Sequence, residues 1–244
     1  MKKTLILTAI CSLAFAAAAE QQTPAAPAPA VVANTQSRVA TDYLTFEVSG
    51  TANFAMNDLF KGMEAERNAS VHTYGSDIAI GHTFEKYHSF NLRFGYAYGN
   101  ADQDIINAWV GGSDTVTFNY DLNTFYLTTG YRFTYEVTPG VGLFLGVNSG
   151  IVNHSVKIKV RDTYVSDYAS YQDAIGEHKS EWGWMYSFDA GCTVDLTENL
   201  YLIMAYQFSG STAAPRFGGK DDNVGILTRA QYHHSVRIGV GFKF

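Results

Sequence analysis

The chain has 244 residues and a formal net charge of -6 at pH 7, and its basic residues are scattered along the sequence. This excludes the clustered positive charge that marks a nucleic-acid-binding protein. Beyond the first 19 residues no apolar run approaches the ~18 residues that a membrane-spanning helix requires, which also excludes an anchored helical protein.

Residues 1–19 have the anatomy of a secretory signal peptide. Two lysines near the N-terminus precede an apolar stretch from Leu5 to Phe15, and Ala17 and Ala19 form an A-x-A cleavage site. We therefore expect the chain to be exported. Cys192 is then the only cysteine of the mature chain, so no intramolecular disulfide is predicted.

Residues 20–41 are rich in alanine and proline and contain little periodic apolar sequence. Such a segment has too little apolar surface to pack, and we expect an extended periplasmic tether. The folded part is predicted to begin at Asp42 and to reach Phe244.

From Tyr43 onward, apolar and polar residues alternate with the period of two that is typical of β-strands. Tight turns are predicted at Glu85–Tyr87, at Thr138-Pro139-Gly140 and at Asp195–Asn199. The expected strands cover residues 43–54, 78–84, 90–98, 116–133, 141–159, 182–192, 200–208 and 232–244.

Several strands end in a related motif. The C-terminal Gly241-Phe242-Lys243-Phe244 has close copies at Gly81–Phe84 and Gly130–Phe133, and a weaker copy at Gly191–Val194. The copies recur every ~50–60 residues, which fits two strands of about ten residues with one long and one short connection. The pattern predicts an all-β fold, an eight-stranded antiparallel up-and-down transmembrane β-barrel.

The connections alternate in length. Three are short turns, whereas the long ones lie around residues 55–73, 100–114, 162–180 and 211–226. Short periplasmic turns and long external loops are typical of outer-membrane barrels. A soluble lipocalin-type barrel would place its apolar residues inside, and the charged and glycine-rich opposite faces disfavour it.

The strand endings and the terminal Phe244 resemble the OmpA-like and opacity-type family of small outer-membrane barrels. The resemblance covers residues 42–244 and implies a location in the bacterial outer membrane, with membrane lipid and the barrel-assembly machinery as partners. In that family the terminal aromatic residue resembles a sorting signal. Since nothing follows Phe244, the peptidoglycan-binding domain of full OmpA proteins is expected to be absent.

Four charged residues are predicted to face the lumen at one level. Glu47, Arg93, Asp189 and Arg237 each lie about five to seven residues from the periplasmic end of their strand. They are expected to form either a structural ion network that plugs the lumen or a gated ion path, since buried charges require partners. Arg132 and Lys243 are expected nearer the rim, in contact with solvent.

Outward aromatic residues are predicted to form two girdles at the membrane interfaces. The external girdle comprises Trp182, Trp184, Tyr96 and Tyr98, and the periplasmic girdle comprises Phe84, Phe133, Phe242 and Phe244.

No catalytic, cofactor or metal site is predicted. His233 and Ser235 share a face and could form a base and nucleophile pair, which faintly resembles the lipid A deacylase barrels. They point inward, however, whereas a lipid substrate requires a site that faces the bilayer. Asp221-Asp222-Asn223 is acidic but lacks the spaced ligands of a calcium loop.

Three functional classes remain open. The first is a non-enzymatic envelope scaffold whose long loops contact or adhere to a host or other extracellular surface ligand. The second is a narrow porin-like channel for ions or small solutes, against which stand the bulky inward residues Tyr126, Phe144, Met185 and Tyr201. The third, a lipid-modifying enzyme, is remote. Apolar loop residues could contact a partner or pack on one another: Leu59, Phe60, Ile105, Ile106, Trp109, Val110 and Phe217.

Overall fold

The computed structural model describes residues 42–56, 60–61, 71–106, 115–162, 178–217, 226–228 and 230–244. The predicted signal peptide and tether lie outside these residues, as do Leu59, Trp109, Val110 and the acidic run at 221–223. No helix among the described residues is long and apolar enough to cross a membrane.

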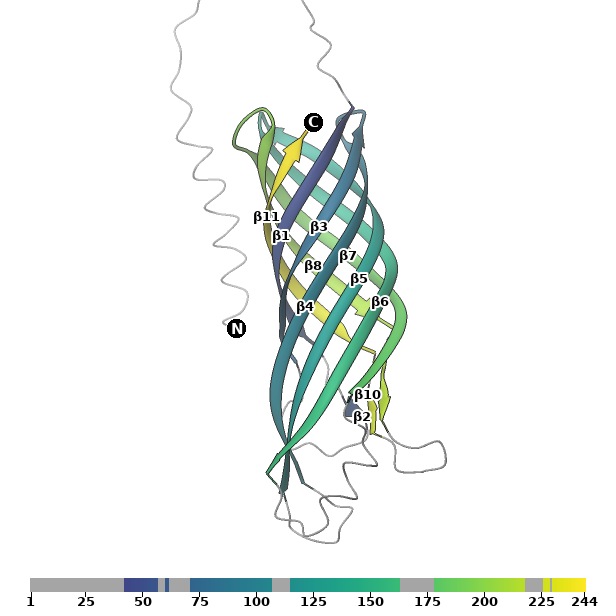
Figure 1. Ribbon diagram of the computed structural model, residues 1–244. Helices are drawn as coiled ribbons and strands as arrows, with labels where there is room; N and C mark the ends of the chain where they lie inside the picture. The colour runs from purple at the N-terminus through teal and green to yellow at the C-terminus, as the bar shows by residue number, and fades with distance from the viewer. Residues whose placement is uncertain are drawn as a thin grey trace, which may run out of the picture. The chain divides into compact units, whose positions relative to one another are not determined.

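Eight strands close into a barrel in which every neighbouring pair is antiparallel, in the order β1-β11-β8-β7-β6-β5-β4-β3 (Figure 1). The predicted fold class, an eight-stranded antiparallel barrel, is confirmed. The strands are β1 (Tyr43–Ala55), β3 (Thr73–Phe84), β4 (His88–Ile106), β5 (Thr115–Thr138), β6 (Val141–Asp162), β7 (His178–Asp195), β8 (Leu200–Ser211) and β11 (Tyr232–Lys243).

The barrel is apolar outside and polar inside. On β3, for example, Ile78 and Ile80 are 45% and 58% exposed, while the intervening Ala79 and the preceding Asp77 are buried. The same alternation extends around the barrel, because successive residues of a strand point to opposite faces. An eight-stranded barrel is narrow enough for side chains to fill its interior, so the polar faces form the core.

One end of the barrel, called here the turn end, carries the short connections. Glu85 and Lys86 have positive φ angles of 51° and 69° in the three-residue turn between the paired residues Phe84 and His88. Gly140, with φ of 80°, makes the turn between β5 and β6. The chain also closes here, since the Phe244 amide donates to the Leu44 carbonyl at 2.9 Å.

Inward glycines make room for large rings from the neighbouring strand. Gly95 pairs with Tyr126, and Gly241 pairs with Tyr201. A Cβ atom at either glycine would collide with the paired tyrosine ring. The tyrosines therefore lie flat against glycine backbone and fill the lumen, as an aromatic side chain covering a strand glycine does in designed sheets.

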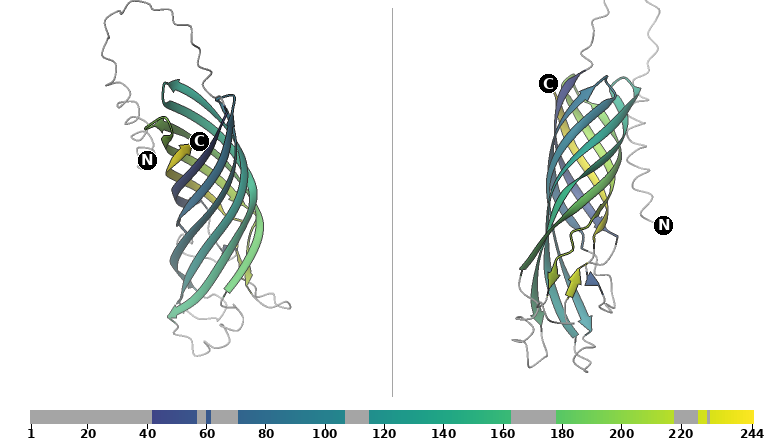
Figure 2. Two further views of the ribbon diagram at one scale, coloured as in Figure 1. Left: turned by 45° about the horizontal axis from the view of Figure 1, so that its top comes forward. Right: turned by 90° about the vertical axis from the view of Figure 1, so that its right-hand side faces the viewer.

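The strands differ in length at the opposite end, called the loop end. β4, β5 and β6 have 19, 24 and 22 residues, whereas β1 has 13 and β3, β8 and β11 have 12 each. One side of the barrel therefore projects beyond the other, as Figures 1 and 2 show. The expected loops around 100–114 and 162–180 are shorter than predicted, and Ile105 and Ile106 belong to β4.

A second, small sheet is formed by the long connections on the other side. It contains β2 (Phe60–Lys61), β10 (Ile226–Thr228) and β9 (Arg216–Phe217), in the order β2-β10-β9. Phe60 and Phe217, predicted as loop residues, thus have strand backbones.

Candidate functional site

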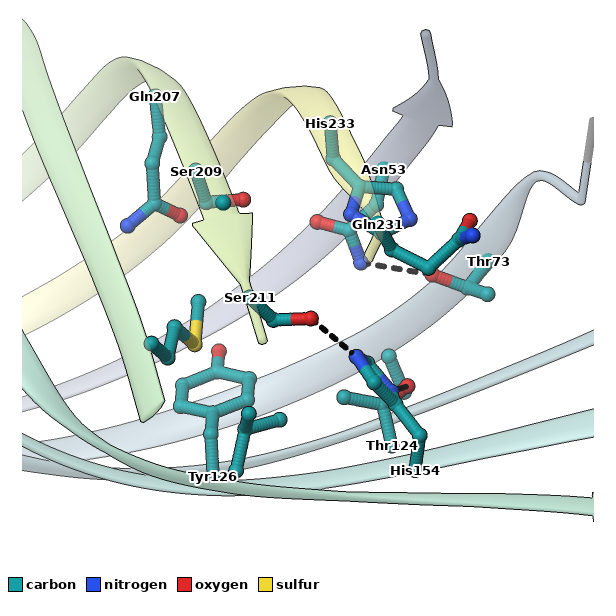
Figure 3. Close-up of a pocket in the computed structure, with 14 residues that line it drawn as sticks. Asn53, Thr73, Thr124, Tyr126, His154, Gln207, Ser209, Ser211, Gln231 and His233 are labelled. Atoms are coloured by element: carbon teal, nitrogen blue, oxygen red, sulfur yellow. Dashed lines mark hydrogen bonds between the residues drawn. The ribbon is translucent and has the colours of Figure 1, made fainter. Parts of the chain in front are cut away.

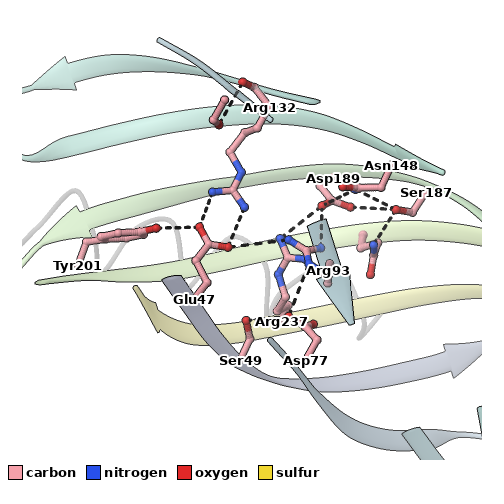
Figure 4. Close-up of polar contacts among 12 residues, drawn as sticks. Glu47, Ser49, Asp77, Arg93, Arg132, Asn148, Ser187, Asp189, Tyr201 and Arg237 are labelled. Carbon is pink, nitrogen blue, oxygen red and sulfur yellow. Dashed lines mark hydrogen bonds and ion pairs between the residues drawn. The ribbon is translucent and has the colours of Figure 1, made fainter. Parts of the chain in front are cut away.

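The most conspicuous polar site is a layer of six charged residues inside the barrel, called here the charged layer: Glu47, Asp77, Arg93, Arg132, Asp189 and Arg237 (Figure 4). They come from β1, β3, β4, β5, β7 and β11, and none is more than 8% exposed. Three carboxylates face three guanidinium groups, so the layer is neutral when all six are ionised.

Glu47 has the best-formed contacts of the layer. Its two carboxylate oxygens accept hydrogen bonds from Arg132 Nη1 at 2.6 Å and Nη2 at 3.0 Å, and Tyr201 donates to Oε1 at 2.8 Å. A bidentate pair of this kind is the strongest form of a carboxylate–guanidinium contact. Arg132 also lies over the Phe144 ring, at 4.7 Å from its centroid.

This geometry shows that the prediction for Arg132 was wrong. It was expected near the rim in contact with solvent, but it is buried and pairs with Glu47. The reason is the length of β5, which continues from Phe133 to Thr138. Arg132 therefore lies six residues inside its strand, at the depth of the other charged residues.

Arg93 is the centre of the layer, because it faces all three carboxylates. Its Nη1 lies 3.4 Å from Asp189, its Nε 3.6 Å from Asp77 and its Nη2 3.9 Å from Glu47. Asp77 also accepts hydrogen bonds from Ser49 and Tyr126, each at 3.3 Å. Asp77 was not among the four charged residues predicted to face the lumen at this level.

Asp189 connects the remaining arginine to the layer. Its Oδ2 atom accepts from Arg237 Nη2 at 3.3 Å and from Asn148 at 3.0 Å. The structure thus brings together the four residues predicted to share one level, Glu47, Arg93, Asp189 and Arg237. Since leaving one partner of a buried ion pair uncompensated is costly, the six residues are energetically interdependent.

Above the charged layer, toward the loop end, lies a neutral polar site around a small cavity of about 30 Å³ (Figure 3). His154, which is buried, bonds to Thr124 Oγ1 at 2.9 Å and to Ser211 Oγ at 2.7 Å. These contacts connect β5, β6 and β8 through the interior. We call this group, with His233, the histidine layer.

His233 and Ser235, the pair considered for catalysis, both lie on the inner face of β11. Within the described part of the chain, His233 Nε2 and Ser235 Oγ have no hydrogen-bond partner, in each other or elsewhere. They therefore do not form the hydrogen-bonded base and nucleophile that covalent catalysis needs.

At the turn end the lumen opens into a vestibule of about 120 Å³. Lys243 donates to Asp195 at 2.7 Å on its edge, and Lys86 pairs with Glu136. Lys243 thus lies at the rim where it was predicted, in an ion pair. The charged layer separates this vestibule from the cavity of the histidine layer. Arg132, on one side of the layer, lines the vestibule. Tyr126, which donates to Asp77 on the other side, lines the cavity.

The predicted girdle residues lie on the outer surface. Trp182, Trp184 and Tyr98 are exposed toward the loop end, and Tyr96 is half-buried against Phe125, with ring centroids 4.7 Å apart. Toward the turn end, Phe133, Phe242 and Phe244 are exposed, and Phe84 stacks on Phe90. The described residues contain no cluster of three or more His, Cys, Asp or Glu side chains that could hold a metal ion.

No protein-family model and no curated protein matches this chain. Among solved structures, it is similar to Neisserial surface protein A, with 14% identity, a TM-score of 0.46, and coverage of 82% of this chain and 97% of that one. A major outer membrane protein from Thermus thermophilus has 12% identity and a TM-score of 0.47, covering 82% and 99%. Ail, the attachment invasion locus protein of Yersinia pestis, has 12% identity and a TM-score of 0.42, covering 83% and 98%.

Proposed function

We propose that this protein is an outer-membrane barrel with a closed lumen, a non-enzymatic envelope scaffold that presents its long connections at the cell surface for contact or adhesion. The observation that carries the proposal is the inverted surface. Large apolar side chains are exposed on seven of the eight barrel strands and half-buried on β8, and charged side chains are buried inside.

Such a surface fits a membrane better than water. Exposed apolar patches beyond a few hundred Å² are rare on soluble monomers, whereas a lipid-facing apolar band with aromatic residues at both margins is typical of membrane barrels. A closed barrel also leaves no unpaired strand edge in the hydrocarbon region. The orientation follows from the connections, since outer-membrane barrels place short turns in the periplasm and long loops outside.

Epitope tags test both the location and the orientation. We would insert a tag into one of the segments 62–70, 107–114 or 163–177, and a control tag at the Pro139–Gly140 turn, in bacterial cells that express the full chain. Tags in the long connections should be labelled on intact cells, and the turn tag only after the outer membrane is permeabilised. Labelling of the turn tag on intact cells would overturn the orientation, and loss of the protein from the outer-membrane fraction would overturn the location.

The closed lumen supports a scaffold over a channel. The charged layer crosses the interior with ion pairs between strands on opposite sides of the barrel, such as Glu47 on β1 with Arg132 on β5. Tyr126, Phe144 and Tyr201 fill the space beside these charges. The alternative, a narrow channel for ions or small solutes, is favoured by the polar cavities on either side of this single layer.

Single-channel recording of the refolded mature chain in planar bilayers decides between these two functions. We expect the native chain to be silent and a Glu47→Ala/Arg132→Ala variant to conduct, since the double change removes one ion pair without leaving either charge alone. Lys243→Ala/Asp195→Ala, which removes an ion pair at the rim, is the matched control and should remain silent. Stable current through the native chain would place transport ahead of the scaffold.

A further inference from the structure

The first and last strands of the barrel, β1 and β11, meet in a polar surface that the direct contacts of the lumen do not account for. In their register Thr51 lies opposite Arg237, and Asn53 lies opposite Ser235. Thr51, Ser235 and Arg237 are all buried. Toward the loop end, His233 is the next inward residue of β11 after Ser235. We call the inward surface formed by these five residues the closing seam.

Five buried polar atoms of the closing seam have no hydrogen-bond partner among the residues that the structure describes. They are Thr51 Oγ1, His233 Nε2, Ser235 Oγ, Arg237 Nε and Arg237 Nη1. Arg237 donates through its remaining nitrogen, Nη2, to Asp189 at 3.3 Å. Buried polar groups nearly always have a partner in the protein, in ordered water or in a bound ion. A run of five such atoms on two adjoining strands therefore indicates a bound ligand.

The chemistry of these atoms selects a small neutral ligand. The three carboxylates and three guanidinium groups of the charged layer already balance, so an added anion beside Arg237 would lack a compensating charge, and Asp189 would repel it. A cation would meet the guanidinium group itself. The N–H bonds of Nε and Nη1 belong to different edges of that planar group, so they need two separate partners. Hydroxyl groups both donate and accept, and water does the same.

The cavity of the histidine layer adjoins the closing seam. Asn53 and His233 line it from the seam, and Gln207, which pairs with Ser235 in the register of β8 and β11, lines it as well (Figure 3). A cavity needs about 10–15 Å³ to hold one water molecule. With about 30 Å³, this cavity has room for about two, within reach of the groups at the upper end of the seam.

Small residues flank the lower end of the closing seam. On β3, Gly75 pairs with Thr51, and on β8, Ala205 pairs with Arg237. Neither residue has a hydrogen-bonding side chain. The neighbouring strands therefore offer no side-chain partner directly opposite these two residues, and a ligand has to supply it.

We propose that the closing seam binds a cluster of ordered water molecules, which extends from the cavity of the histidine layer past Ser235 to Arg237 and Thr51. The inference goes beyond the proposed function, because it concerns the interior alone. It makes the charged layer asymmetric. Glu47 and Arg132 close one side by direct ion pairing, whereas water-mediated hydrogen bonds complete the side where the first and last strands meet.

The sign of the effect of Thr51→Val tests the proposal. The mature chain would be refolded into phosphatidylcholine vesicles and unfolded in urea, with tryptophan fluorescence as the readout. Valine has the shape of threonine but cannot bond water, so the equilibrium constant for unfolding should rise about fivefold, the usual size for one hydrogen bond. A hydroxyl without a partner would give the opposite result, since its removal relieves a desolvation penalty.

Thr73→Val is the matched control. It removes a buried hydroxyl that accepts a hydrogen bond from Asn53 at 3.0 Å, and it should raise the same constant by a similar factor. A constant that is lowered or unchanged in Thr51→Val would overturn the proposal. Failure of the native chain to fold in the vesicles would instead overturn the proposed membrane function.

Crystals of the native chain grown from sodium bromide identify the ligand without any variant. We expect electron density for water within hydrogen-bond distance of Arg237 Nε and Nη1 and of Ser235 Oγ, with no anomalous signal from bromide there. A bromide peak beside Arg237 would replace the water cluster by an anion site. Density for neither, with Arg237 turned toward a protein acceptor, would show that the closing seam is dry. Either result would overturn the proposal.

Discussion

The charged layer and the histidine layer close the same lumen with different chemistry. In the charged layer Arg93 contacts all three acids, and Glu47 and Asp189 each face a second guanidinium group. In the histidine layer the contacts are neutral, and His154 alone joins Thr124 to Ser211. The residues of the charged layer therefore stabilise the barrel only together, whereas the hydrogen bonds of the histidine layer contribute independently. Substitutions in the two layers should accordingly differ in how much stability they remove and in whether their effects add.

The largest effect is expected from Glu47→Ala. It leaves Arg132 buried with Phe144 and without its carboxylate, and breaking a buried pair in this way costs about 3–5 kcal/mol. Urea unfolding of the refolded barrel, followed by tryptophan fluorescence, measures this. The double variant Glu47→Ala/Arg132→Ala should be less destabilised than the sum of its single variants. Additive effects would contradict the interdependence of the charged layer.

The second-largest loss of stability is expected from a substitution where the charged layer meets the histidine layer. Gly95→Ala places a Cβ against the ring of Tyr126, which bonds Asp77 below and lines the histidine cavity above. Overpacking of this kind costs about 1–3 kcal/mol. The Gly95→Ala/Tyr126→Ala double variant should lose less stability than the sum of the two single variants, because Tyr126→Ala removes the ring with which the new Cβ collides. If the two losses of stability simply added, the new Cβ would not be in contact with the Tyr126 ring.

A smaller effect is expected from His154→Ala. The variant loses two neutral hydrogen bonds, each worth about 1 kcal/mol, and leaves no charge without a partner. The loss should therefore be about 2 kcal/mol and should add to that of Glu47→Ala in the combined variant. A loss as large as that of Glu47→Ala would erase the distinction between the layers.

The smallest loss of stability is expected from a substitution at the rim of the vestibule. Lys243→Ala removes an ion pair with Asp195 that is partly exposed, and exposed ion pairs contribute about 0–1 kcal/mol. The urea midpoint should hardly change, and the remaining difference should disappear at high salt, which screens exposed charges. A loss above about 2 kcal/mol would show that the charged layer extends to the vestibule.

The fold could be predicted because lipid-facing strands must alternate strictly. Ile78 and Ile80 on one face and Asp77 and Ala79 on the other are enough to orient β3. The projecting ends of β5 and β6 lie almost wholly within the strands expected at 116–133 and 141–159, but that of β4 could not be predicted in this way. Beyond Tyr98, β4 reads Gly-Asn-Ala-Asp-Gln-Asp, which has no apolar face, so the sequence resembles a loop.

The site was predicted in part. Glu47, Arg93, Asp189 and Arg237 were found by counting from strand ends, and Arg132 was misplaced because β5 was ended at Phe133 instead of Thr138. Asp77 was missed for another reason. Strands in a barrel are tilted and staggered, so equal counts along two strands do not give equal depth, and the reach of a long side chain such as Arg93 is not visible in a pattern.

The charged layer also has a consequence for how the chain reaches its folded state. Its contacts join residues far apart in sequence: 85 residues separate Glu47 from Arg132, and 96 separate Arg93 from Asp189. Only Asp77 and Arg93 meet within one hairpin, that of β3 and β4; the pairs of Glu47 with Arg132 and of Asp189 with Arg237 need more distant strands, and Arg237 arrives only with the last strand. An incomplete barrel therefore holds unpaired charges in its interior, and each such charge opposes its burial. The ion pairs thus act as an internal check on assembly, satisfied only when the first and last strands meet.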